Sequence, residues 1–275
     1  MTKREFVNHV ANLVGGNVVE VEKANGVIFT GIQMPAKDNG DGNKIAPTIY
    51  LDEQYENGWS IDDAVAYVFK ADKENQVTVD LDFAYDFELA KPMLRVGMIN
   101  KKSNVPCYIS AEKFGFDDLI IYPYVELSTS EIGVASLKVT SGLLENWGVD
   151  LDTVISIALE NMENETKVVP FIEQLIKLGM PMAMVSDSSI MNDWFVVTNE
   201  NKCNGAVNII TQKAKDLLPK EYIVIPSSIH EVIVAPYTEE TKEEISALAE
   251  IIGEVNKTEV KPEEVLGYKP YVIRG

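Results

Sequence analysis

Apolar residues recur at helical spacing in many segments of the chain. In residues 2–14, Val10 follows Phe6 by four positions and Val7 by three, and Gly15-Gly16 come after as a helix stop. Near the C-terminal end, Thr238 precedes two glutamates and a long apolar stripe, as at the start of a capped helix. On these criteria the chain predicts helices over residues 2–14, 48–56, 60–71, 83–89, 150–161, 169–178, 213–218 and 238–255.

Short β-branched runs predict strands between these helices. The clearest local signal is Asn25-Gly26, where both residues tolerate positive φ, so we expect residues 18–23 and 27–34 to form an antiparallel hairpin. Pro123 points to an edge or a bulge in its strand, and residues 94–99 fit either a helix end or a strand. Further strands are predicted over residues 120–127, 133–140, 194–198, 206–210, 222–225 and 232–235.

Hairpin signals combined with long helices favour an α+β fold over a doubly wound parallel sheet. We expect a mixed, mainly antiparallel sheet with packed helices, an N-terminal hairpin and a strand-rich C-terminal half. A chain of 275 residues has room for one large domain or two lobes. The predicted lobes are residues 1–130 and 131–275, with a single continuous domain as the alternative.

The charge of the chain narrows the classes of partner. Asp and Glu outnumber Lys and Arg by 43 to 24, which gives a net charge of −19. The arginines are Arg4, Arg95 and Arg274. Binding to nucleic acid requires basic groups that displace counterions from phosphates, so no direct nucleic-acid binding is expected. An acidic surface suits solubility or a protein partner with a basic surface.

Targeting, metal and cofactor signals are absent from the sequence pattern. No run of eighteen apolar residues is present, so no membrane span is expected, and the charged N-terminus predicts a cytoplasmic protein with Cys107 and Cys203 reduced. His9 and His230 lie far apart in the sequence, and the acidic loop at residues 38–43 fails the calcium-loop pattern. No glycine-rich nucleotide loop follows a strand. We therefore expect neither a metal nor a cofactor.

One polar cluster stands out as candidate chemistry. Ser227, Ser228, His230 and Glu231 lie between two apolar β-branched runs. A serine nucleophile with a histidine base is the catalytic interpretation, and Ser228 and His230 would share a strand face. No nucleophile-elbow motif accompanies them. In the structural interpretation, these side chains satisfy backbone groups at a strand crossing, with His230 largely buried and hydrogen-bonded and Glu231 facing water or a lysine.

Several short motifs follow one another along the chain. They are Pro47-Thr48-Ile49-Tyr50-Leu51-Asp52, Met98-Ile99-Asn100 with Asn104, Ala135-Ser136-Leu137, Asn146-Trp147, Val196-Val197-Thr198-Asn199 followed by Gly205-Ala206, and Pro226-Ser227-Ser228-Ile229-His230-Glu231. This set resembles an uncharacterised family of domain-of-unknown-function proteins from anaerobic Gram-positive bacteria, often those of the gut. The resemblance covers residues 17–260 and carries no activity. Leu266-Gly267-Tyr268 departs from the family pattern.

Three functional hypotheses follow. The first is a non-enzymatic binding or modulating protein, associated with mobile elements, that meets a basic protein partner. The second is a hydrolase built on Ser228 and His230. The third is a nucleic-acid mimic that inhibits a nucleic-acid-binding protein, which requires rows of carboxylates at phosphate-like spacing. The lack of a recognisable active-site pattern favours the first.

Overall fold

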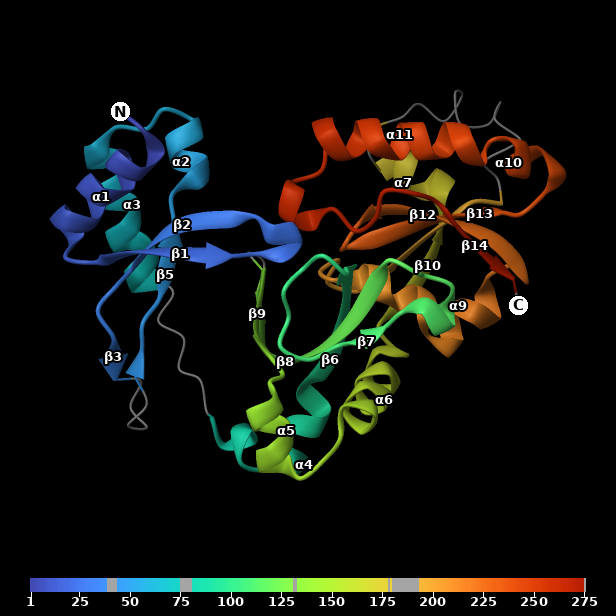
Figure 1. Cartoon of the computed structure of the whole chain (residues 1–275), viewed down its shortest axis with the longest axis horizontal. Helices are drawn as coiled ribbons and strands as arrows, with labels where there is room; N and C mark the ends of the chain where they lie inside the picture. Colours follow the sequence, from blue (N-terminus) through green and yellow to red (C-terminus); the bar gives the residue numbers. More distant parts are fainter. Residues whose placement is uncertain (39–43, 75–80, 131–132, 178, 180–192, 275) are drawn as a thin grey trace. The chain divides into compact units, whose positions relative to one another are not determined.

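The computed structural model describes residues 1–38, 44–74, 81–130, 133–177, 179 and 193–274 (Figure 1). The chain divides into two compact units, Met1–Leu81 and Asp82–Gly275. Among the described residues, no helix has the length and apolar character needed to cross a membrane.

The first unit packs helices against a small antiparallel sheet. Its helices are α1 (Lys3–Val14), α2 (Asp52–Glu56) and α3 (Ile61–Glu74), with a 3-10 turn η1 (Ala24–Gly26). Strands β1 (Asn17–Glu22), β2 (Ile28–Gln33) and β5 (Thr48–Tyr50) form one sheet in that order, and β3 (Lys37–Asp38) pairs with β4 (Lys44–Ile45). The core contains Phe6, Val10, Ile32, Leu51 and Val68.

The predicted hairpin is confirmed. β1 pairs antiparallel with β2 across Asn25 and Gly26, whose φ angles are 60° and 73°. The predicted helix over residues 48–56 is wrong in its first half, because Thr48 and Ile49 pair with β2 and Ile49 is buried. The helix begins only at Asp52.

The second unit contains two larger antiparallel sheets. One has the strand order β10-β11-β13-β12-β14, and in the other β8 pairs with β6, β7 and β9. Its strands are β6 (Leu94–Asn100), β7 (Ile109–Ser110), β8 (Leu119–Ser130), β9 (Gly133–Lys138), β10 (Thr166–Pro170), β11 (Phe195–Asn199), β12 (Glu221–Ser228), β13 (Glu231–Pro236) and β14 (Tyr271–Arg274).

Helices surround these sheets. The α-helices are α4 (Phe87–Ala90), α5 (Ser141–Trp147), α6 (Leu151–Met162), α7 (Phe171–Lys177), α9 (Gln212–Leu217), α10 (Glu239–Glu243) and α11 (Ile245–Thr258). The 3-10 turns are η2 (Asp82–Ala84), η3 (Lys91–Met93), η4 (Glu112–Phe114), η6 (Gly205–Ile210) and η7 (Pro262–Glu264). The fold is α+β with antiparallel pairing, as the sequence predicts.

Alternation along β12 gives the five-stranded sheet two different faces. Ile223 and Ile225 pack with Ile252 of α11. Tyr222 and Val224 point to the opposite face, because successive strand residues alternate. Figure 1 shows α11 and α9 on opposite sides of this sheet. The face turned away from α11 holds the cavity described below.

The unit boundary differs from the expected one. The units meet between residues 81 and 82, whereas the predicted lobes meet between residues 130 and 131. β8 ends at Ser130 and pairs with β9 from Tyr124 onwards. A boundary there would separate two partners of one hairpin.

Other departures from the prediction have local causes. Residues 206–210 form η6 rather than a strand, because an apolar run that is buried on every side has no periodicity to distinguish the two. The predicted helix over residues 238–255 is broken at Glu244 into α10 and α11. Residues 94–99 are strand β6. β10 and β14 were not predicted as strands.

Pro123 lies in an interior strand instead of an edge or a bulge. It is opposite Val96 on β6, and the bulge in β8 occurs between Glu126 and Ser128. Its carbonyl oxygen accepts a hydrogen bond from the Val139 N–H at 3.0 Å, on the side away from β6. In an antiparallel strand the N and C=O of one residue point to the same side. The missing N–H therefore removes no bond between β6 and β8.

Candidate functional site

The polar cluster of residues 227–231 forms the tight turn between β12 and β13. Ser228 is paired with Glu231, so Ile229 and His230 are the two turn residues. The expectation that Ser228 and His230 share a strand face is therefore wrong. Ser227 and Glu231, which lie close to this turn in the chain, are half-buried.

Every polar group of His230 has a neighbour that orients it. Its Nδ1 accepts a hydrogen bond from the Asn204 backbone N–H at 3.2 Å, and its own N–H donates to Ser228 Oγ at 3.1 Å. Its carbonyl oxygen accepts from Thr198 Oγ1 at 2.8 Å. Nε2 lies 3.7 Å from Glu264 Oε1, and the side chain is 31% exposed. The predicted hydrogen bonding is present, but His230 is less buried than expected because the turn lies at the end of the sheet.

This geometry leaves His230 poorly suited to act as a general base. A neutral imidazole has one lone pair on nitrogen. Here that lone pair is at Nδ1 and faces the Asn204 N–H, so Nε2 carries the proton beside Glu264. Ser228 Oγ in turn accepts from the backbone of His230. The imidazole therefore orders two chain segments instead of taking a proton from a serine.

The turn between β12 and β13 contacts a segment that is distant in sequence, residues 198–206. An added Cβ at Gly205 would lie 2.6 Å from both His230 O and Thr198 Oγ1, so the close approach requires glycine. Ala206 N–H donates to Ile229 O at 3.1 Å. Ile229 also packs against the buried residues Ile99, Val105, Ile120, Tyr122 and Tyr124 of the neighbouring sheet and loop. The motifs around residues 196–206 and 226–231 thus form one structural unit.

A family model described as a family of unknown function, DUF5688, matches residues 3–274. The chain belongs to the DUF5688 family. The match is longer than the span of residues 17–260 over which the motifs suggested a resemblance. Comparison with curated proteins and with solved structures gives no significant match.

The cysteines of this DUF5688 chain are not activated. Both thiols are free and half-buried. Burial raises the pKa of Cys203, and the nearby carboxylates Glu126 and Glu264 raise it further. Burial likewise raises the pKa of Cys107. Because the thiolate is the nucleophilic form, both residues are poor nucleophiles at neutral pH.

Adjacent acidic residues could offer carboxylates to a magnesium ion, but Asp63, Asp117 and Asp118 have other partners. Asp63 accepts a hydrogen bond from the Ser60 hydroxyl at 2.6 Å at the start of α3, and Asp117 pairs with Lys269. Asp118 accepts from the Tyr271 hydroxyl at 2.8 Å. Within the part of the chain that the structure describes, no three His, Cys, Asp or Glu residues are grouped to hold a metal ion. Residues 39–43 of the acidic loop lie outside that part.

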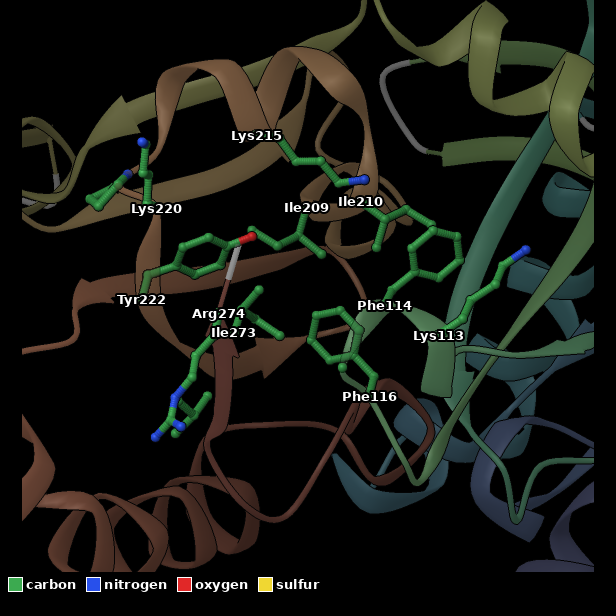
Figure 2. A pocket seen from close by; sticks show the side chains of 13 residues that line it. Lys113, Phe114, Phe116, Ile209, Ile210, Lys215, Lys220, Tyr222, Ile273 and Arg274 are labelled. Atoms are coloured by element: carbon green, nitrogen blue, oxygen red, sulfur yellow. The ribbon is translucent and has the colours of Figure 1, made fainter.

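A cavity of about 750 Å³ lies on the α9 side of the five-stranded sheet (Figure 2). It is formed by η4, the end of η6, α9 with the following turn, and the strands β12 and β14. Its lining residues are Lys113, Phe114, Gly115, Phe116, Ile209, Ile210, Lys215, Pro219, Lys220, Tyr222, Val272, Ile273 and Arg274. None of them is acidic, which contrasts with a chain whose net charge is −19.

Tyr222 is the buried polar group of this cavity. The residue is 6% exposed, and burial raises the pKa of its phenol. Its position on β12 places it on the cavity face, and Figure 2 shows its hydroxyl directed toward Ile209. No described residue makes a hydrogen bond to this hydroxyl, and its oxygen is not among the fully enclosed polar atoms without a partner. The phenol is therefore an available hydrogen-bond donor in an apolar setting.

Sequence reasoning missed this cavity because its walls come from three separate stretches, residues 113–116, 209–222 and 272–274. No single stretch has a binding motif. The one local signal is the alternation of Lys220 and Tyr222, which places a cation and a phenol on one face of β12 and the turn before it.

Proposed function

We propose that the chain is a non-enzymatic binding protein. It holds a small ligand with an apolar body and an anionic group in the cavity beside Tyr222. The cavity volume of about 750 Å³ falls within the range of about 300–1,000 Å³ that is usual for small-molecule sites. Its floor is apolar, with Phe116, Ile209 and Ile210 at most 5% exposed. A floor of this kind favours an alkyl or aryl body.

The single observation that carries the proposal is the Tyr222 hydroxyl. Among the described residues this hydroxyl has no hydrogen-bond partner, so it can donate to a ligand oxygen in the cavity. A typical hydrogen bond of this kind contributes about 0.5–1.5 kcal/mol, and one to a charged acceptor about 1.5–3 kcal/mol. Since burial raises the pKa of Tyr222, the phenol stays protonated and remains a donor at neutral pH. A carboxylate is the matching acceptor, because a charged acceptor strengthens the bond.

The charge around the cavity supports an anion over a cation. Lys113, Lys215 and Lys220 are exposed lining residues. Among the described residues, no carboxylate lies within 4 Å of their ammonium groups. A patch of unpaired cations on an acidic chain attracts anions locally and leaves the rest of the surface repulsive to them.

A binding role also agrees with the geometry at His230, whose lone pair is engaged with the backbone. The hydrolase hypothesis therefore gains no support from Ser228 and His230. A basic protein partner and nucleic-acid mimicry remain predictions from the net charge.

The proposal is tested by calorimetric titration of the full chain with decanoate and with nonyltrimethylammonium, which have the same nine-carbon alkyl chain and opposite charge. At about 0.5 kcal/mol per non-hydrogen atom, twelve atoms give about 6 kcal/mol, or a dissociation constant of about 40 μM for decanoate. We expect no binding of the cation. Equal binding of both, or of neither, would contradict the proposal.

Variants locate the site. Tyr222→Phe removes only the hydroxyl, and the lost charge-assisted hydrogen bond should weaken decanoate binding about tenfold or more. Tyr268→Phe is the matched control, because Tyr268 is 49% exposed and does not line the cavity. Weakening by the control as large as that by Tyr222→Phe would place the ligand elsewhere.

A further inference from the structure

The cations around the cavity lie at two opposite ends of its apolar floor. At one end, Lys113 of η4 and Lys215 of α9 lie over the ring of Phe114, with Nζ–centroid distances of 5.0 Å and 5.6 Å. Figure 2 shows the Phe114 ring between the two ammonium groups. Such contacts hold the flexible lysine chains near the ring. This end therefore has a positioned pair of positive charges.

Lys220 marks the other end of the cavity. It lies two residues before Tyr222, and Figure 2 shows both on the opposite side of Ile209 from Phe114. The Tyr222 hydroxyl, on a residue that is 6% exposed, adds a hydrogen-bond donor at this end. The two cationic ends are separated by Ile209 and its apolar neighbours.

Arg274 lines the edge of the cavity, but its guanidinium contacts Tyr237. Its guanidinium lies 5.3 Å from the centre of the Tyr237 ring and donates to Tyr237 Oη at 3.3 Å. Tyr237 packs with the α11 side of the sheet, together with Val272. Alternation along β14 places Arg274 on that same side and Ile273 on the cavity side. The Arg274 guanidinium therefore belongs to neither of the two cationic ends.

We infer that the ligand of this cavity carries an anionic group at each end of an apolar body. The inference rests on the proposed function and narrows its ligand class from an apolar anion to a two-ended one, such as an α,ω-dicarboxylate. One anionic group accepts from Tyr222 and faces Lys220, and the other faces Lys215 and Lys113. The apolar body lies along Ile209 and Phe116.

The test compares decanedioate with decanoate, which differ only in the second carboxylate, by calorimetric titration of the full chain. We expect decanedioate to bind about fivefold more tightly, the gain from a second, partly exposed ion pair. Lys220→Gln, and separately Lys113→Gln with Lys215→Gln, should each reduce this ratio to about one. Lys257→Gln, at an exposed position of α11 that does not line the cavity, should leave the ratio unchanged.

The outcomes distinguish a failure of the two-ended ligand from a failure of the proposed function. Equal binding of the two acids to the unaltered chain overturns the two-ended ligand and leaves the proposed function in place. Binding of neither acid overturns both. A ratio that survives both sets of lysine substitutions, or that Lys257→Gln abolishes, also overturns the assignment of the two ends.

Discussion

Replacing Gly205 with alanine tests the close contact between the β12–β13 turn and residues 198–206. The added Cβ would lie 2.6 Å from His230 O and Thr198 Oγ1 and 2.7 Å from Asn199 N. Two of these atoms are backbone, so the clash is not relieved by a rotamer change. Overpacking of this kind costs about 1–3 kcal/mol. Displacing Thr198 also breaks its hydrogen bond to His230 O, worth about 1 kcal/mol.

The expected loss is therefore about 2–4 kcal/mol, measured as the free energy of unfolding in urea and followed by the fluorescence of Trp147 and Trp194 in the second unit. For a unit of this size the melting temperature should fall by about 5–15 °C. Gly253→Ala in α11 is the matched control, since an added Cβ there meets nothing within 4 Å. It should stabilise the protein by about 0.5–1 kcal/mol. A Gly205→Ala variant as stable as the unaltered chain would refute the close approach.

Three further predictions test other parts of the account. Arg95→Lys should cost about 1–3 kcal/mol in urea unfolding, because the Arg95 guanidinium binds Glu165 through two nitrogens and also donates to Pro92 O and Leu94 O; an unchanged stability would contradict this role. Burial raises the pKa of Tyr122 to about 12, above the value of about 10 in the unfolded chain. The free energy of unfolding should therefore fall as pH rises through about 10–12. Urea titrations at several pH values should show a smaller fall for Tyr122→Phe. With a net charge of −19, the chain should bind neither DNA nor RNA in fluorescence titrations at about 150 mM salt; micromolar affinity there would refute the prediction.

Local signals along the chain gave the fold class and much of the secondary structure. Asn25-Gly26 predicts its hairpin because the turn geometry depends on those two residues alone. The start of α6 is similarly local, since Asp150 caps it by accepting from the Thr153 N–H at 2.7 Å. Elements set by tertiary pairing were harder to predict. Thr48–Tyr50 becomes a strand only because β2 is available as its partner.

The candidate site likewise combines residues that local sequence indicated with partners that only the tertiary fold brings close. The sequence singled out His230 and its serine neighbours, but the partner that defines their role is the backbone N–H of Asn204, twenty-six residues away. A backbone donor has no signature in side-chain composition. The cavity at Tyr222 was missed altogether, because Phe114 and Ile273 meet only after the chain has folded.

The central claim is that the cavity beside Tyr222 binds an apolar anion, and a crystal structure of the full chain with decanoate tests it most directly. The account predicts the carboxylate at about 2.7 Å from the Tyr222 hydroxyl, with the alkyl chain against Ile209 and Phe116. Decanoate bound on another surface, or an empty cavity at saturating decanoate, would contradict it.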